Sequence, residues 1–244
     1  MPSEDWDFYF LLVDDEPASI YLDLALARSA PVRALPHMAY VRLHMRQPRP
    51  DGLSSNDEFE TLSALEDRLT DSVVRDVGAV YAGRNTSGGC RDFYFYVGQP
   101  ERFEPSVARA MTDYPDYRYE ADTREDPDWD VYFGFLYPPP DDFQRIQNRR
   151  VIESLASHGD RHDVPRTIDH RVYLGDGDAA QRLRAELLAL GFEVEAPKTM
   201  ENDVALDFQR RDRPDSIDDV VLPIVRRARE LGGTYDGWGC EVVS

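Results

Sequence analysis

The order of apolar periodicities in residues 166–243 most constrains the fold of this chain. Strand-like and helix-like segments follow one another as strand, helix, strand, strand, helix, strand. This order is typical of the ferredoxin-like split βαβ sandwich, in which two helices cover one face of an antiparallel sheet. Residues 37–121 show the same order. The sequence therefore predicts an α+β protein made of two tandem ferredoxin-like sandwiches.

A run of three prolines, Pro138 to Pro140, predicts the boundary between the two sandwiches. We accordingly expect one domain over residues 1–139 and a second over residues 140–244. Ahead of the first sandwich, Trp6 to Val13 is predicted as a strand and Ala18 to Ala30 as a helix with one apolar face.

A long amphipathic helix is predicted after the first strand of the first sandwich. Ser55 and Glu58 have the spacing of a capping box, in which the serine hydroxyl and the glutamate carboxylate satisfy the first free N–H groups of a helix. Apolar residues then recur at three- and four-residue steps. Glu58 and Glu66 lie two helical turns apart, so an acid–base pair is one interpretation, and a cap plus a solvated carboxylate is the other.

Net charge excludes several function classes. The 244 residues contain 47 acidic and 28 basic side chains, which gives a formal net charge of −19. Such a surface repels phosphate backbones and anionic lipids and favours basic protein partners. We therefore expect no direct nucleic-acid binding. Lys198 is the only lysine, which disfavours Schiff-base and P-loop chemistry.

The chain shows no sign of membrane insertion or of a disulfide framework. No apolar run reaches the length of a membrane helix, and the N-terminal residues Met1 to Asp5 are acidic, unlike a signal peptide. Cys90 and Cys240 fall in different predicted domains and belong to no Cys-x-x-Cys motif. We expect a cytoplasmic protein with free thiols, no cofactor and no membrane association.

The glycine-rich C-terminal segment is the first candidate site. Gly237 and Gly239 lie within a strand pattern, which indicates a bulge or a close backbone approach. Tyr235, Asp236 and Trp238 lie beside them and are candidate partner-binding residues. The alternative interpretation places the two aromatic rings in the core, where most large aromatic side chains lie.

A predicted hairpin in the first domain carries the second candidate site. Arg84 and Arg91 flank a loop rich in glycine and small polar residues. Two arginines in such a position are candidates for binding an anion, and ion pairs with the acidic helices are the alternative. The loop joins two strands and no lysine follows it, so it does not match a phosphate-binding loop.

Metal binding is weakly indicated at two places. His158 and His162 are four residues apart beside two aspartates, but Gly159 interrupts the helix that would align the imidazoles. The segment from Asp126 to Asp130 begins like a calcium loop but lacks the glycine and glutamate that such a loop requires. We therefore predict no metal site.

The second half resembles the family of the regulator of ribonuclease E activity B, RraB. The resemblance covers about residues 142 to 243 and rests on these segments: Arg150-Val151-Ile152, Leu155, Gly159-Asp160, Pro165-Arg166-x-Ile168-Asp169-His170, Leu190-Gly191-Phe192-Glu193-Val194 and Tyr235-Asp236-Gly237-Trp238-Gly239. It implies a small, acidic α+β protein that binds the endoribonuclease RNase E and restrains RNA decay without cleaving RNA.

The first half resembles the bacterial domain-of-unknown-function family 695 over about residues 3 to 138. The residues that carry this resemblance are Trp6, Pro48, Gly52-Leu53, Glu58, Leu62, Glu66, Tyr81, Gly83, Thr86, Arg91, Tyr94, Tyr96, Asp126, Trp129, Tyr132 and Leu136. This resemblance implies no activity.

Three functions agree with these observations. The first is a non-enzymatic regulator that binds a basic protein, which the resemblance suggests is RNase E. The second is an acidic inhibitor or immunity-type protein directed at another basic nuclease or toxin. The third is an enzyme with an anion site at Arg84 and Arg91. The oligomeric state stays open.

Overall fold

The computed structural model describes residues 4–13 and 15–243. Met1 to Ser3, Asp14 and Ser244 lie outside it, and with them the start of the acidic N-terminal segment. The chain divides into two compact units, one that ends at Pro138 and one that begins at Pro139. Each unit contains helices and one antiparallel sheet, which confirms the α+β class.

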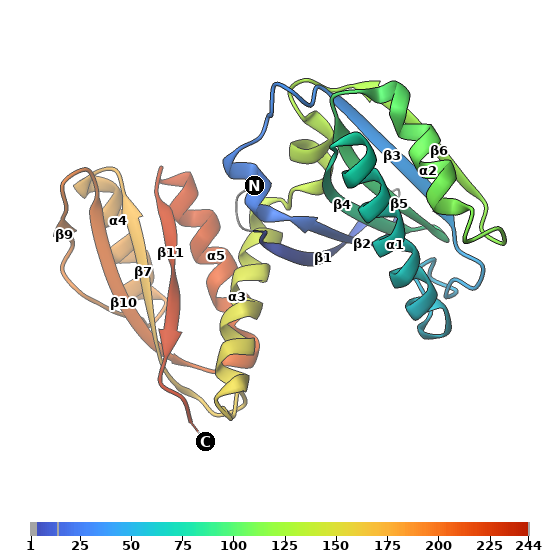
Figure 1. Ribbon diagram of the computed structural model, residues 1–244. Helices are drawn as coiled ribbons and strands as arrows, with labels where there is room; N and C mark the ends of the chain where they lie inside the picture. The colour runs from blue at the N-terminus through green and yellow to red at the C-terminus, as the bar shows by residue number, and fades with distance from the viewer. Residues whose placement is uncertain (1–3, 14, 244) are drawn as a thin grey trace. The chain divides into compact units, whose positions relative to one another are not determined.

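The first unit contains a six-stranded sheet in the order β1-β2-β4-β5-β3-β6. Its elements are β1 (Trp6–Val13), β2 (Glu16–Asp23), β3 (His37–His44), α1 (Asn56–Val77), β4 (Val80–Ser87), β5 (Cys90–Val97), α2 (Phe103–Met111) and β6 (Tyr119–Glu125), with 3-10 turns at Leu24–Arg28 and Pro100–Arg102 and a π-helical turn at Tyr132–Leu136. Strands β3 to β6 with α1 and α2 have the ferredoxin-like order, and the β1–β2 hairpin extends that sheet beside β4 (Figure 1).

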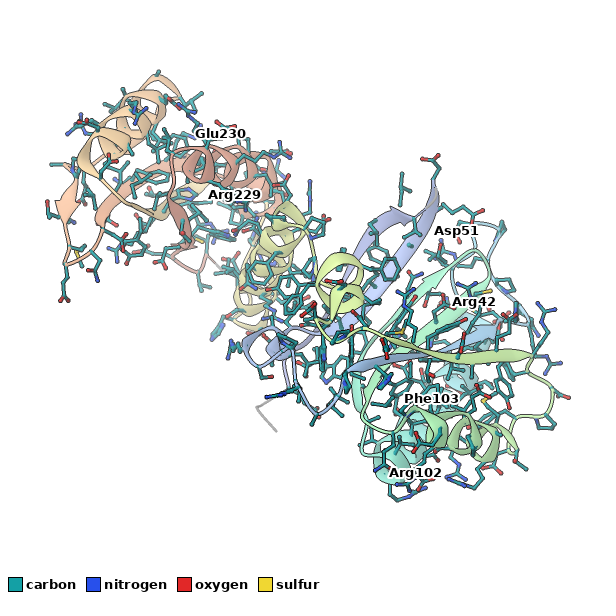
Figure 2. The ribbon with its side chains drawn as sticks, turned by 90° about the horizontal axis from the view of Figure 1, so that it is seen from above. Arg42, Asp51, Arg102, Phe103, Arg229 and Glu230 are labelled. Carbon is teal, nitrogen blue, oxygen red and sulfur yellow. The ribbon has the colours of Figure 1, made fainter. Side chains whose placement is uncertain are left out.

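Helices α1 and α2 form the core of this unit with one face of the sheet. Leu62, Leu65 and Leu69 of α1 are fully buried among side chains of β3 and β5. The start of α2 shows how the helix is oriented, because Phe103 is fully buried and lies toward the sheet, whereas Arg102 beside it is exposed (Figure 2).

The segment after β6 covers part of the opposite face of the first sheet. The ring of Trp129 stacks on Tyr96 of β5 with the ring centroids 3.7 Å apart. Asp126 accepts hydrogen bonds from the Tyr96 hydroxyl at 2.7 Å and from the backbone N–H groups of Asp130 and Val131. The segment that begins like a calcium loop therefore uses its first carboxylate as a structural cap.

Two local predictions for the first unit are wrong. Residues 18–23 belong to strand β2, and the rest of the predicted helix is a short 3-10 turn. Pairing of β2 with β1 and β4 outweighs the helical pattern. Ser55 is the N-cap residue of α1, but its side chain makes no capping bond. Glu58 instead accepts hydrogen bonds from Arg46 N, Gln47 N and the Tyr117 hydroxyl, each at 2.8 Å.

The second unit contains a sheet in the ferredoxin-like order β11-β7-β10-β8. Its elements are α3 (Pro140–Ser157), β7 (Arg166–Leu174), α4 (Gly177–Ala189), β8 (Glu193–Val194), β9 (Lys198–Thr199), β10 (Val204–Asp212), a 3-10 turn (Pro214–Ser216), α5 (Ile217–Glu230) and β11 (Thr234–Cys240). Helices α4 and α5 pack on one face of the sheet, and α3 packs beside α5 (Figure 1). The opposite face, which we call the open face, includes Asp169, Arg171, Asp207 and Gln209.

Across the described residues, no helix combines the length and apolar content that crossing a membrane requires.

Candidate functional site

The C-terminal strand β11 divides the predicted partner-binding residues between the core and the surface. Tyr235 and Trp238 are each only 9% exposed. The Trp238 indole N–H donates a hydrogen bond to Asn148 Oδ1 of α3 at 3.0 Å, and the Tyr235 hydroxyl lies 2.7 Å from His170 Nδ1. Asp236 is exposed. Both aromatic rings therefore lie in the core, as the alternative interpretation expected. Partner binding by this segment stays a prediction.

A β-bulge explains how Tyr235 and Trp238, three residues apart, reach the same face of the sheet. Tyr235 lies opposite Val172 of β7, and Gly237 lies opposite the next residue of that strand, Arg171, so Asp236 has no partner in the register. Gly237 has φ +155°, a conformation that disfavours side chains. The extra residue restores the alternation, so that Trp238 points inward like Tyr235.

His170 of β7 points into the core and lies opposite Trp238 of β11 in the sheet. Its ring stacks on Phe208 with centroids 5.1 Å apart, and its Nε2 atom is buried without a hydrogen-bond partner. Burial lowers the pKa of His170 to about 4, because the apolar surroundings disfavour the charged imidazolium. The residue is therefore neutral at physiological pH.

The loop between α3 and β7 is held by Asp160. This carboxylate pairs with Arg166 of β7, accepts a hydrogen bond from Val243 N at 2.7 Å and lies 2.8 Å from His162 Nδ1. The hydrogen bonds, above all that from Arg166, hold the pKa of Asp160 well below its usual range. Asp160 therefore joins the loop to the residues that follow β11.

The two histidines that suggested a metal site have different partners. His162 contacts Asp160, whereas His158 Nδ1 lies 2.7 Å from the backbone oxygen of Ser154 in α3. Within residues 4–13 and 15–243, no group of three or more histidine, cysteine, aspartate or glutamate side chains is arranged to hold a metal ion.

The open face of the second sheet carries two adjoining hollows of about 490 and 320 Å³. Asp169, Arg171 and Asp207 line both hollows. Arg171 and Lys198 pair with Asp207 at 2.5 and 2.9 Å, and the hydrogen bond from Arg171 is the main reason why the pKa of Asp207 is lowered. Lys198 also pairs with Glu195 at 2.8 Å, so both cations that line the hollows already have carboxylate partners.

Other carboxylates on the open face remain available to a partner. Asp169 and Asp236 form no ion pair within the described parts of the chain. Gly239 lies opposite Asp169 and Gly237 lies opposite Arg171. At these two positions, β11 therefore has no side chain beside Asp169 and Arg171. A Cβ atom added at either glycine would meet no atom within 4 Å. The open face can thus present carboxylates and bare backbone to another protein.

The predicted anion site in the first unit is an internal ion-pair cluster. Arg84 Nη1 lies 2.6 Å from Glu66 Oε1, and Arg91 Nη1 lies 3.4 Å from Glu66 Oε2. The Tyr81 hydroxyl donates to the same carboxylate at 2.9 Å. Burial, followed by repulsion from Arg84, lowers the pKa of Arg91 to about 10. The two arginines thus hold the chain's own carboxylate, and binding of an external anion stays a prediction.

Sequence reasoning missed the roles of Glu58 and Glu66. Neither residue fits the acid–base pair or the combination of a cap and a solvated carboxylate. Glu58 and Glu66 are only 5% and 9% exposed, and each carboxylate has its own set of hydrogen-bond partners. The one available signal was the presence of two arginines on a hairpin beside a helix rich in glutamate. Asp160 was likewise noted only as a neighbour of the two histidines.

These features define a two-domain α+β protein in which each half contains a ferredoxin-like sandwich. Residues 4–137 match the model of a family of unknown function, DUF695. Because this match spans more than half of the 244 residues, the chain belongs to the DUF695 family. Residues 145–240 match the family model named Regulator of ribonuclease activity B. Both resemblances inferred from the sequence are thereby confirmed.

Individual relatives align with the second unit. The Regulator of ribonuclease activity B of Escherichia coli (strain K12) is 29% identical over 103 residues, which cover 39% of this chain and 75% of that protein. The protein of the same name from Proteus mirabilis is 27% identical over 103 residues, or 39% of this chain and 72% of that protein. A crystal structure of an unknown protein from Galdieria sulphuraria covers 86% of this chain and 99% of its own with 11% identity, but its TM-score of 0.24 supports no argument.

Proposed function

We propose that this protein is a non-catalytic regulator that binds a ribonuclease of the RNase E type through its second domain and thereby restrains RNA decay in the cytoplasm. The observation that carries the proposal is the match of residues 145–240 to the regulator family. The matched range contains α4, α5 and all five strands of the second sheet. The proposal therefore concerns a complete sandwich.

The open face is the proposed contact surface. Five carboxylates and two cations line its two hollows, so the face carries an excess of negative charge. A basic segment of the ribonuclease would meet Asp169 and Asp236 beside the bare backbone at Gly237 and Gly239. Opposite charge at an interface speeds association and selects the partner, and its effect weakens as salt is added.

The experiment compares charge-neutralised variants of the full chain. Purified RNase E is incubated with its RNA substrate, and the cleavage rate is measured with and without this protein. We expect inhibition by the wild type and, for Asp169→Asn/Asp236→Asn, a complex about tenfold weaker, because two favourable surface charges are lost. Asp178→Asn/Glu153→Gln changes net charge equally on helices α4 and α3 and should leave inhibition unchanged.

Three results would contradict parts of this proposal. Wild-type protein that neither binds nor inhibits RNase E at low ionic strength would refute the partner. Equal weakening by both double variants would refute the open face as the contact surface. Selective capture of another basic nuclease or toxin would favour an inhibitor or immunity-type protein. A net charge of −19 suits that function equally well, because it also attracts a basic target.

A further inference from the structure

The first domain contains a groove that the proposed ribonuclease contact does not use. Its volume is about 690 Å³, within the range of ligand sites. Helix α1 forms one wall with Glu66, Thr70 and Val74, which follow one another at four-residue steps. Residues of the β1–β2 hairpin form the other wall, and Val80 and Tyr81 of β4 contribute to the lining.

The groove exists because the sheet is wider than its helical layer. The core beneath α1 and α2 takes buried side chains from β3 and β5 and partly buried ones from β4 and β6. Among the described residues it includes none from β1 or β2. The helix side of the hairpin is therefore left beside α1 without a helix of its own. A segment of another polypeptide can lie along this uncovered strip.

Aromatic rings form one side of the groove. The Trp6 ring lies 5.0 Å from Tyr21 and 5.3 Å from Tyr81, measured between ring centroids. Trp6 is partly exposed, and its indole N–H points to Glu4 at 3.3 Å. Aromatic faces of this kind attract cations, and tryptophan does so most strongly.

Carboxylates dominate the charged lining. Glu4, Asp67 and Asp71 are exposed at the groove. The one cation in the lining, Arg75, lies 3.0 Å from Asp76 and is thus already paired. The groove therefore favours a positively charged occupant and repels anions.

The chain itself shows how such an occupant is held. The guanidinium carbon of Arg84 lies 4.4 Å from the centroid of the Tyr21 ring, and its Nη1 atom lies 2.6 Å from Glu66 Oε1. A guanidinium is planar, so it stacks on a ring while its N–H groups reach a carboxylate. Next to this pair, the Trp6 ring and the exposed carboxylates of the groove provide a second aromatic face with acidic groups nearby, which suits a second guanidinium.

We propose that this groove binds an arginine side chain presented by a basic polypeptide segment of a partner protein. The proposal concerns the first domain and does not rest on the ribonuclease assignment. Length favours a polypeptide, because the α1 wall runs over two helical turns, from Glu66 to Val74. Arginine is favoured over lysine because its flat guanidinium matches both the ring and the carboxylates.

Tryptophan fluorescence of the full-length protein tests the proposal directly. The other two tryptophans, Trp129 and Trp238, are buried, so a ligand in the groove changes mainly the signal of Trp6. The probe is a blocked octapeptide in which arginine alternates with glycine, and the matched probe carries glutamate in place of arginine. We expect a saturable change with the arginine peptide, none with the glutamate peptide, and loss of the change in Trp6→Phe.

Charge variants separate the groove from general attraction. Asp67→Asn/Asp71→Asn should weaken peptide binding about tenfold, because two surface carboxylates beside the guanidinium are removed. Asp57→Asn/Glu60→Gln removes the same charge from exposed positions of α1 outside the groove and should leave the affinity within about twofold. Thr70→Arg places a cation inside the groove and should abolish binding.

The proposal is overturned if the two double variants lose affinity equally, or if Thr70→Arg binds like the wild type with unchanged circular dichroism. It is also overturned if free arginine or spermidine saturates the Trp6 signal while the octapeptide does not, because the groove would then be a small-cation site. A lysine peptide that binds as tightly as the arginine peptide would refute the preference for arginine. Binding to the ribonuclease is measured separately, so either proposal can fail alone.

Discussion

Asp160 and Arg166 lie six residues apart in the sequence and form a buried ion pair that holds Glu241 and Val243, which follow β11. Their side chains are 0% and 8% exposed. Arg166 also donates to the backbone oxygen of Glu241 at 2.9 Å, and Asp160 accepts from Val243 N. The pair therefore joins the loop after α3, the first residue of β7 and the residues beyond β11.

Asp160→Asn should lower the free energy of unfolding of the second domain by about 3 kcal/mol, because it leaves the Arg166 guanidinium buried without a counter-charge. Amide hydrogen exchange, evaluated separately for residues 4–138 and 139–243, measures this loss domain by domain. Asp163→Asn changes an exposed carboxylate of the same loop and should have little effect. Equal protection in both variants would contradict a stabilising role of the pair.

Acid should destabilise the second domain through His170. The unfolded chain takes up a proton near the ordinary pKa of 6.5, whereas the folded chain resists protonation until about pH 4. Stability contributed by the neutral ring is therefore complete above pH 6.5 and falls as the pH decreases toward 4, by about 3 kcal/mol in total. His170→Phe/Tyr235→Phe removes both hydrogen-bonding partners and should flatten this part of the profile.

Denaturant unfolding between pH 7.5 and pH 4 measures that difference, since titration of the carboxylates affects both proteins alike. Identical profiles for the wild type and the double variant would show that His170 takes up its proton as easily in the folded state as in the unfolded state.

Two glycines at bulges should differ in their tolerance of alanine. Gly83 and Gly237 have φ values of +152° and +155°, so alanine strains the backbone at both, by about 1–3 kcal/mol. At Gly237 the added Cβ meets nothing within 4 Å, whereas at Gly83 it comes within 2.4 Å of Tyr21 O. We expect Gly83→Ala to destabilise its domain more than Gly237→Ala does.

Gly239→Ala is the control for these variants, because Gly239 has neither a positive φ nor a crowded Cβ position. Domain-resolved hydrogen exchange again gives the measurement. A larger loss for Gly237→Ala than for Gly83→Ala would mean that steric crowding by the Tyr21 backbone is unimportant.

Glu66→Gln should destabilise the first domain by about 3 kcal/mol. The substitution leaves Arg91, only 2% exposed, facing Arg84 without the carboxylate that neutralises both. Glu60→Gln, on an exposed position of the same helix, is the matched control. Thermal unfolding followed by circular dichroism compares the two, and equal melting temperatures would contradict the proposed importance of the cluster.

The ferredoxin-like order of both units was predictable because it depends on local periodicity. Leu62, Leu65 and Leu69 repeat at helical steps, and β7 alternates between core and open face. Strand β2 was predicted as a helix although Ala18, Ile20 and Leu22 alternate with Ser19 and Tyr21. That alternation and the hairpin with β1 were local signals of a strand, whereas the pairing with β4 involves residues more than sixty positions away.

The candidate sites were less predictable for the same reason. Glu58 has the spacing of a capping box, but its hydrogen bonds go to Arg46, Gln47 and Tyr117, up to 59 residues away. Arg84 and Arg91 were found on the hairpin as expected, and only the packing of α1 against the sheet shows that Glu66 lies between them. The groove at Trp6 depends on the same packing and was not predicted.

The bulge at Gly237 also has a consequence for reading related sequences. In a regular strand, two residues on one face are separated by an even number of positions, whereas Tyr235 and Trp238 are three positions apart. An odd number of positions between two inward-facing aromatic residues, with a glycine between them, therefore indicates a β-bulge with one extra residue. A relative that lacks this glycine should have its two aromatic residues two or four positions apart. A side chain would then cover the part of the open face that Gly237 leaves bare here.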